Sequence, residues 1–125
     1  MSQQVLLVED DPNLCYILSL LLQQENTEFV AVTSARNAIS HCQISRPDLI
    51  ILDLELAGDE GFALLEWLDQ HPPAKPIPVL IYTACDVEYQ ERLRLESHFT
   101  QVFTKGRISP MEFQERVHQL LAQAS

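Results

Sequence analysis

Several polar side chains stand just beyond the ends of short apolar runs in this chain. Asp53 follows the run 49–52, and Glu9 and Asp10 follow the run 5–8. If these runs are neighbouring parallel strands, their carboxyl ends meet at one edge of a sheet, and the three carboxylates gather there. Hard oxygen ligands of this kind suit Mg²⁺, which binds one or two carboxylates and keeps several waters. We expect Asp10 and Asp53 to be direct ligands and Glu9 to act through a water molecule.

A hydroxyl and an ammonium group occupy corresponding places later in the chain. Thr83 follows the apolar run 79–82, and Lys105 comes shortly after the run 102–103. A carboxylate can attack phosphorus and form an acyl phosphate if the charge on the transferring oxygens is neutralised. A bound cation and Lys105 would neutralise it, and Thr83 could donate its hydroxyl to a phosphoryl oxygen. Each residue alone has an ordinary structural explanation, but together they make Asp53 a candidate phosphoryl acceptor.

The apolar runs also predict the elements that hold these side chains. Four runs are short and nearly unbroken, as in strands that are covered on both faces, and a more mixed fifth run is typical of a sheet edge. The five predicted strands are residues 5–8, 29–32, 49–52, 79–82 and 99–103. The segments between them are long enough for helical crossovers. The predicted fold is therefore α/β: a doubly wound, parallel, five-stranded sheet of flavodoxin-like strand order 2-1-3-4-5, with five helices.

The start of the first helix has the clearest local signal. Asp11 can cap it, with Pro12 at the first helical position. We prefer this capping role for Asp11 to a role in metal binding. Apolar residues then recur at helical spacing and should pack this helix on the sheet: Leu14, Ile17, Leu18 and Leu21.

Similar signals mark the later helices. Ser34 can cap the second, whose predicted inner stripe is Ala35, Ala38, Ile39 and Cys42. Asp59 or Glu60 should begin the third. A fourth, after Asp86, has the weakest apolar periodicity of the set, and the fifth begins with a capping box that Ser109 opens.

Composition limits the possible functions. A chain of 125 residues fits one domain, residues 1–125. Its 18 acids and 8 Lys and Arg give a net charge of −10, which opposes direct binding to nucleic acid. No apolar run approaches membrane-spanning length, and no signal peptide is apparent, so a cytoplasmic location is expected. The cysteines and histidines lack metal-ligand spacing, which argues against a disulfide framework and a zinc site.

Four separated motifs together resemble those of response-regulator receiver domains. They are Leu6-Leu7-Val8-Glu9-Asp10-Asp11, Leu49-Ile50-Ile51-Leu52-Asp53-Leu54 with Gly61 further on, Thr83-Ala84, and Lys105. The resemblance spans nearly the whole chain. It implies that Asp53 is the phosphoacceptor, Thr83 the switch hydroxyl and Lys105 the residue that binds the phosphoryl group. The metal ligands that it implies are Glu9, Asp10, Asp53 and the backbone carbonyl of Glu55.

The resemblance also implies a function. The domain would accept a phosphoryl group on Asp53, with Mg²⁺, from a phosphohistidine on a sensor histidine kinase or a histidine phosphotransfer protein. It would not be an enzyme beyond its own phosphorylation and possible autophosphatase activity. Output would pass through protein–protein contacts, whether the domain is a stand-alone regulator or is excised from a hybrid kinase.

Four residues depart from the family pattern. Gly106 replaces the proline that usually follows the lysine, so we predict a trans peptide bond there, because a cis bond without proline costs about 3 kcal/mol. Val102 replaces the switch aromatic, and some other movement must then carry the signal. Ala57 replaces a frequent proline, and Glu55 places an acid two residues beyond the acceptor.

Three alternatives to phosphorylation-dependent signalling can be weighed. Val102 and Gly106 motivate a receiver-like interaction module that works without phosphorylation. A flavin-binding protein could share the strand order, but acids after the first strand would repel the flavin phosphate. A phosphatase with an aspartyl nucleophile would need a second aspartate where Glu55 stands.

Overall fold

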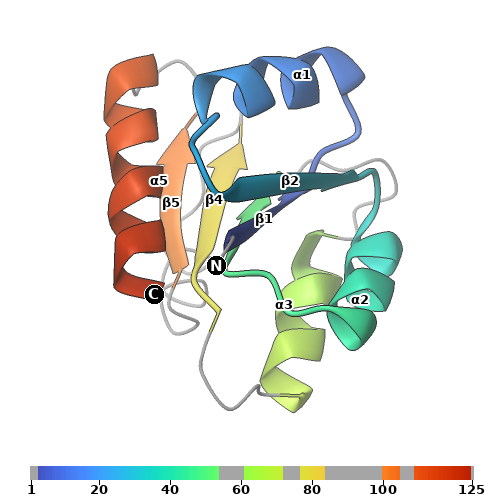
Figure 1. Ribbon diagram of the computed structural model, residues 1–125. Coiled ribbons are helices and arrows are strands. Elements are labelled where there is room, and N and C mark those ends of the chain that lie inside the picture. The colour runs from blue at the N-terminus through green and yellow to red at the C-terminus, as the bar shows by residue number, and fades with distance from the viewer. Residues whose placement is uncertain (1–2, 54–60, 72–76, 84–99, 105–108, 125) are drawn as a thin grey trace.

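Five parallel strands form one sheet in the computed structural model, which describes residues 3–53, 61–71, 77–83, 100–104 and 109–124. The strands are β1 (Gln3–Val8), β2 (Thr27–Val32), β3 (Leu49–Leu52), β4 (Val79–Thr83) and β5 (Thr100–Thr104). Their order is β2-β1-β3-β4-β5, as the sequence predicted (Figure 1).

Helices cover both faces of this sheet. The described helices are α1 (Pro12–Leu21), α2 (Ala35–Ile44), α3 (Gly61–Gln70) and α5 (Pro110–Ala124). In Figure 1, α1 and α5 lie on one side of the sheet and α2 and α3 on the other. The fourth predicted helix, after Asp86, lies outside the described residues, as do Asp59 and Glu60. None of the helices described has the length and apolar character that crossing a bilayer requires.

The core is divided by the sheet into two layers. Alternate strand residues point to opposite faces. In β4, Ile81 packs with the cluster beneath α2 and α3, whereas Leu80 and Tyr82 pack with the cluster beneath α1 and α5. β3 is buried along its whole length because both clusters cover it. The predicted doubly wound α/β architecture is thus confirmed.

The prediction that residues 29–32 are covered on both faces holds only in part. Phe29 packs on the cluster beneath α1 and α5, and Val30 and Val32 pack on the cluster beneath α2 and α3. No residue of β2 is fully buried, and Glu28 and Ala31 are exposed. β2 pairs with β1 alone and forms one edge of the sheet. An edge strand has a neighbour on one side only, so helices cover it less completely.

The helix caps agree with the sequence. The side chain of Ser34 accepts a hydrogen bond from the N–H of Asn37, and the Ser109 hydroxyl accepts one from the N–H of Glu112 at 3.1 Å. In α2, Ala35 and Ala38 are buried, as predicted.

One prediction about the inner face of α1 was wrong. Ile17 is 57% exposed, whereas Leu18 is buried. Leu22, immediately after α1, is fully buried and occupies the position one turn beyond Leu18. The buried arc therefore centres on Leu18, and Ile17 lies at its outer border.

Candidate functional site

The register of the central strands brings the predicted acids together. Val8 of β1 pairs with Leu52 of β3, so the next residue on each strand, Glu9 and Asp53, leaves the sheet at the same level. The N–H of Glu9 donates to the carbonyl oxygen of Val32 at 3.0 Å, which continues the β1–β2 pairing as far as Glu9. Backbone pairing in the sheet therefore sets the positions of both acids.

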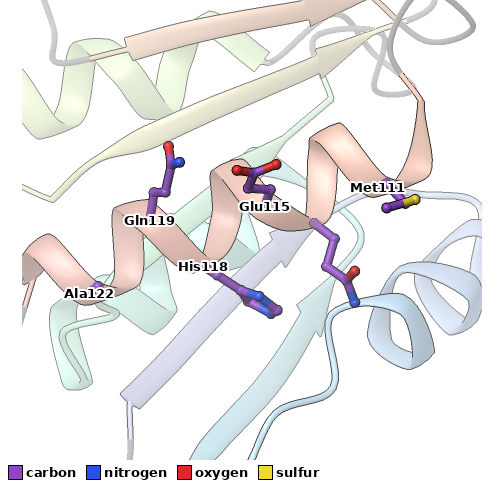
Figure 2. Close-up of a pocket in the computed structure, with 6 residues that line it drawn as sticks. Met111, Glu115, His118, Gln119 and Ala122 are labelled. Carbon is purple, nitrogen blue, oxygen red and sulfur yellow. The ribbon is translucent and has the colours of Figure 1, made fainter.

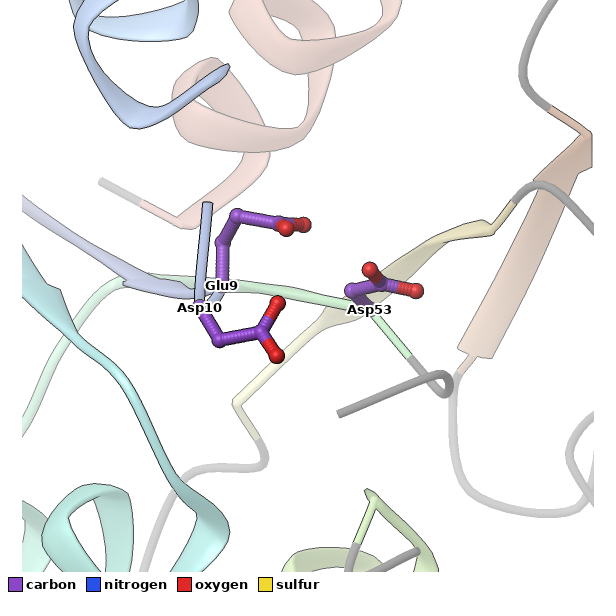
Figure 3. A group of neighbouring side chains, drawn as sticks. All are labelled: Glu9, Asp10 and Asp53. Atoms are coloured by element: carbon purple, nitrogen blue, oxygen red, sulfur yellow. The ribbon is translucent and has the colours of Figure 1, made fainter. Parts of the chain in front are cut away.

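Three carboxylates converge at this edge of the sheet. One ligand oxygen each from Glu9, Asp10 and Asp53 lies within 4.8 Å of the others. Figure 3 shows the carboxylates of Asp10 and Asp53 facing each other, with that of Glu9 beside them. Glu9 is 6% and Asp53 5% exposed, whereas Asp10 is open to solvent. We call this group the acid triad.

A divalent cation fits the acid triad. Three carboxylates this close repel one another, and burial of two of them increases the cost. A hard cation bound by oxygen ligands offsets that repulsion, and the exposed Asp10 side leaves room for metal-bound water. Within the described ranges, the acid triad is the one group of three or more potential metal ligands that lie this close together.

Asp11 has the capping role that the sequence predicted. Its Oδ1 accepts a hydrogen bond from the N–H of Asn13 at 2.9 Å. The sequence did not reveal a second contact, in which the Asp11 N–H donates to Oε1 of Glu9 at 3.2 Å. The start of α1 therefore orients Glu9.

Cys15 also lies beside the triad. Its Sγ donates to the carbonyl oxygen of Glu9 at 3.6 Å. Burial raises the pKa of the Cys15 thiol, and the nearby charges of Glu9, Asp11 and Asp10 raise it further. A neutral thiol is a poor metal ligand, so the donor set consists of oxygens.

The remaining predicted site residues are only partly described. Thr83 is the last residue of β4 and pairs with Thr104 of β5. Lys105 and Glu55 lie outside the described residues, as do Ala57 and Gly106. Their proposed roles therefore stay predictions.

A pocket of about 460 Å³ lies along α5. Figure 2 shows its lining on α5: Met111, Gln114, Glu115, His118, Gln119 and Ala122. None of these residues was predicted to belong to the functional site.

An aromatic pair near Thr83 was not predicted. The rings of Tyr82 in β4 and Phe113 in α5 stack with centroids 4.6 Å apart and an interplanar angle of 27°. Strand alternation indicates that Tyr82 and Ile81 face opposite sides of the sheet. It does not reveal which helical residue meets Tyr82.

Comparison with known protein families leads to the same assignment as the acid triad and the strand order. The model of the response regulator receiver domain matches residues 5–118. The chain belongs to the response regulator receiver domain family. Such receivers act in two-component signalling and are not classical enzymes. They bind a divalent cation at the acidic pocket, and the family implies a histidine kinase as partner.

Individual relatives support this assignment. The receiver is 28% identical over 121 residues to the alkaline phosphatase synthesis transcriptional regulatory protein PhoP of Bacillus subtilis, covering 97% of this chain and 49% of PhoP. It is 29% identical over 126 residues to the phosphate regulon transcriptional regulatory protein PhoB of Escherichia coli, covering 100% of this chain and 54% of PhoB. The receiver thus spans about half the length of these two relatives.

Solved structures show the same fold. The signal receiver domain of a signal transduction histidine kinase from Syntrophus aciditrophicus superposes with a TM-score of 0.80 at 27% identity, covering 98% of this receiver and 92% of that domain. Receiver domains thus occur both in regulators and in kinases.

Proposed function

We propose that this receiver accepts a phosphoryl group on Asp53 from a phosphohistidine, with Mg²⁺ as its cation. The observation that carries the proposal is the convergence of Glu9, Asp10 and Asp53 within 4.8 Å. The donor would be a sensor histidine kinase or a histidine phosphotransfer protein. The domain would comprise residues 1–125 and would signal through protein contacts.

The transfer is a single displacement at phosphorus. A carboxylate oxygen of Asp53 attacks and forms the new O–P bond, while the P–N bond to the donor imidazole breaks and its electron pair stays on that nitrogen. The nitrogen then takes up a proton. Bound Mg²⁺ would neutralise charge on the phosphoryl oxygens.

The other proposed site residues would bind the cation and the phosphoryl group next to Asp53. Glu9 and Asp10 complete the carboxylate donor set, and the backbone carbonyl of Glu55 would add one oxygen ligand. The Lys105 ammonium would bind a phosphoryl oxygen, and the Thr83 hydroxyl would donate to another. Burial of Asp53 supports this arrangement, because the charge interactions around it are stronger than in open solvent.

Output is proposed to pass through protein contacts rather than through DNA contacts of this chain. PhoP and PhoB are transcriptional regulators by name, and this chain spans about half of each. The chain itself carries a net charge of −10, which DNA phosphates would repel. We therefore do not expect this chain itself to bind DNA.

Intact mass spectrometry after treatment with acetyl phosphate and Mg²⁺ tests the proposal. The wild type should gain the mass of one phosphoryl group, and Asp53→Asn should gain none. Asp69→Asn is a matched control, because Asp69 is an exposed acid on α3 away from the triad. A wild-type protein that gains no mass would favour the phosphorylation-independent module that Val102 and Gly106 motivate.

A further inference from the structure

The stacked rings of Tyr82 and Phe113 join the end of β4 to α5. Tyr82 is half-buried and packs with the cluster beneath α1 and α5. Phe113 is only 1% exposed. Offset aromatic pairs at this separation add about 0.5–1.5 kcal/mol beyond the burial of their surface. The pair is therefore a specific contact as well as a part of the core.

α5 is a fixed support for this contact. Nε2 of Gln114 donates to the carbonyl oxygen of Leu21 at the end of α1, at 2.7 Å. Nε2 of Gln3 donates to the carbonyl oxygen of Leu121, also at 2.7 Å, and ties α5 to β1. Both hydrogen bonds involve residues of α5 that follow Phe113, and they restrain the helix that carries it.

Tyr82 is also the residue directly before Thr83. Consecutive Cα atoms across a trans peptide are about 3.8 Å apart, so a sideways shift of Tyr82 displaces Thr83 with it. β5 contributes Val102, paired with Ile81, where the resemblance led us to expect an aromatic residue. Tyr82, directly before Thr83, has an aromatic side chain that stacks on Phe113 of α5.

We propose that Tyr82 is a positioning residue for phosphoryl transfer: its ring, held against Phe113, sets the place of Thr83 at the end of β4. The role rests on the proposed phosphorylation of Asp53. Since coupling is reciprocal, attraction of Thr83 to the phosphoryl group also displaces the Tyr82 ring against α5. Phosphorylation would then alter the contact between Tyr82 and α5, although Val102 stands where the family usually has an aromatic residue.

A double-mutant cycle tests the positioning role. The rate of phosphorylation by acetyl phosphate and Mg²⁺ is measured by intact mass for Tyr82→Leu, Thr83→Ala and the double variant. Leucine keeps an apolar side chain in the cluster but removes the ring contact. We expect Tyr82→Leu to be slower by about tenfold, because small displacements at a reacting centre are costly. The double variant should match Thr83→Ala, because Tyr82 acts through Thr83.

Tyr82→Phe is the conservative variant. It keeps the ring and should retain a rate within about twofold of the wild type, since stacking does not require the hydroxyl. A wild-type rate in Tyr82→Leu, or an equal loss in the presence and absence of the Thr83 hydroxyl, would overturn the role. A wild type that is not phosphorylated at all would instead refute the proposed function.

Fluorine NMR of the wild type gives a readout that needs no destabilising variant. The protein is labelled with 3-fluorotyrosine, and Tyr82→Phe identifies the Tyr82 signal by its loss. Complete phosphorylation, confirmed by mass on the same sample, should shift the Tyr82 signal. Tyr16, which is 65% exposed on α1, should not respond. An unchanged Tyr82 signal in fully phosphorylated protein would contradict the coupling.

Discussion

The backbone N–H of Asp53 donates a hydrogen bond to the carbonyl oxygen of Val8 at 3.1 Å. This bond extends the pairing of β1 and β3 by one residue, beyond the last apolar side chains. It fixes the main chain of the proposed acceptor against the strand that leads into Glu9. Repulsion among the carboxylates therefore acts on side chains whose backbones cannot easily move apart.

Mg²⁺ should stabilise the folded protein through the acid triad. Binding to the native state alone adds about 2.7 kcal/mol to the free energy of unfolding when free Mg²⁺ is about a hundredfold above its dissociation constant. Asp10→Asn should lose most of this gain, because it removes the exposed carboxylate. Urea unfolding with EDTA and with Mg²⁺ measures both values.

Without metal, Asp10→Asn should no longer be less stable than the wild type. Two like charges about 4 Å apart repel by about 1 kcal/mol even in water. Asp10→Asn should therefore be at least as stable as the wild type in EDTA, whereas Asp69→Asn on α3 should respond to Mg²⁺ as the wild type does. An unaltered Mg²⁺ response in Asp10→Asn would place the cation elsewhere.

Asp11→Ala should lower the free energy of unfolding by about 1 kcal/mol, because it removes the acceptor for the Asn13 N–H at the start of α1. Asp11→Asn keeps an oxygen acceptor and should lose much less. Both variants should keep the stabilisation by Mg²⁺, which the same urea titrations measure. Loss of the Mg²⁺ response in Asp11→Asn would show that Asp11 belongs to the metal site.

Much of this structure could be predicted from the sequence, because its signals are local. The apolar runs predicted five strands, and the rule that ligands bind beyond the carboxyl ends of parallel strands brought Glu9 to Asp53. The exposure of Ile17 could not be predicted, because it depends on how α1 is rotated on the sheet. The contact between Tyr82 and Phe113 could not be predicted either, because it depends on how α5 packs against β4. The residue pattern within each segment does not determine that packing.

Gln114→Ala should destabilise the protein by about 1 kcal/mol, the usual net value of a single hydrogen bond, because the carbonyl oxygen of Leu21 loses its partner on α5. Gln119→Ala is the matched control. Its side chain lies on the same helix but is exposed, and it accepts a hydrogen bond from Arg116 at 2.8 Å. This control should stay within about 0.5 kcal/mol of the wild type. Equal losses in urea unfolding would show that the contact between α5 and α1 contributes nothing specific.

Cys42 should make stability depend on pH in the alkaline range. Burial raises the pKa of its thiol from 9.0 to about 11, since Cys42 packs on the cluster beneath α2 and α3. Below pH 9 the thiol is protonated in both states, so its contribution to stability is complete. Between pH 9 and about 11 the unfolded chain releases the proton and the folded protein keeps it, so stability falls as pH rises.

Comparison with Cys42→Ala isolates this effect from other groups that titrate in the same range. Urea unfolding of both proteins is measured below pH 9 and again near pH 11. The free energy of unfolding of the wild type should fall more steeply than that of Cys42→Ala, so the advantage of the wild type shrinks. Parallel pH profiles would mean that the folded protein does not suppress ionisation of Cys42, and that α2 does not shield this thiol from water.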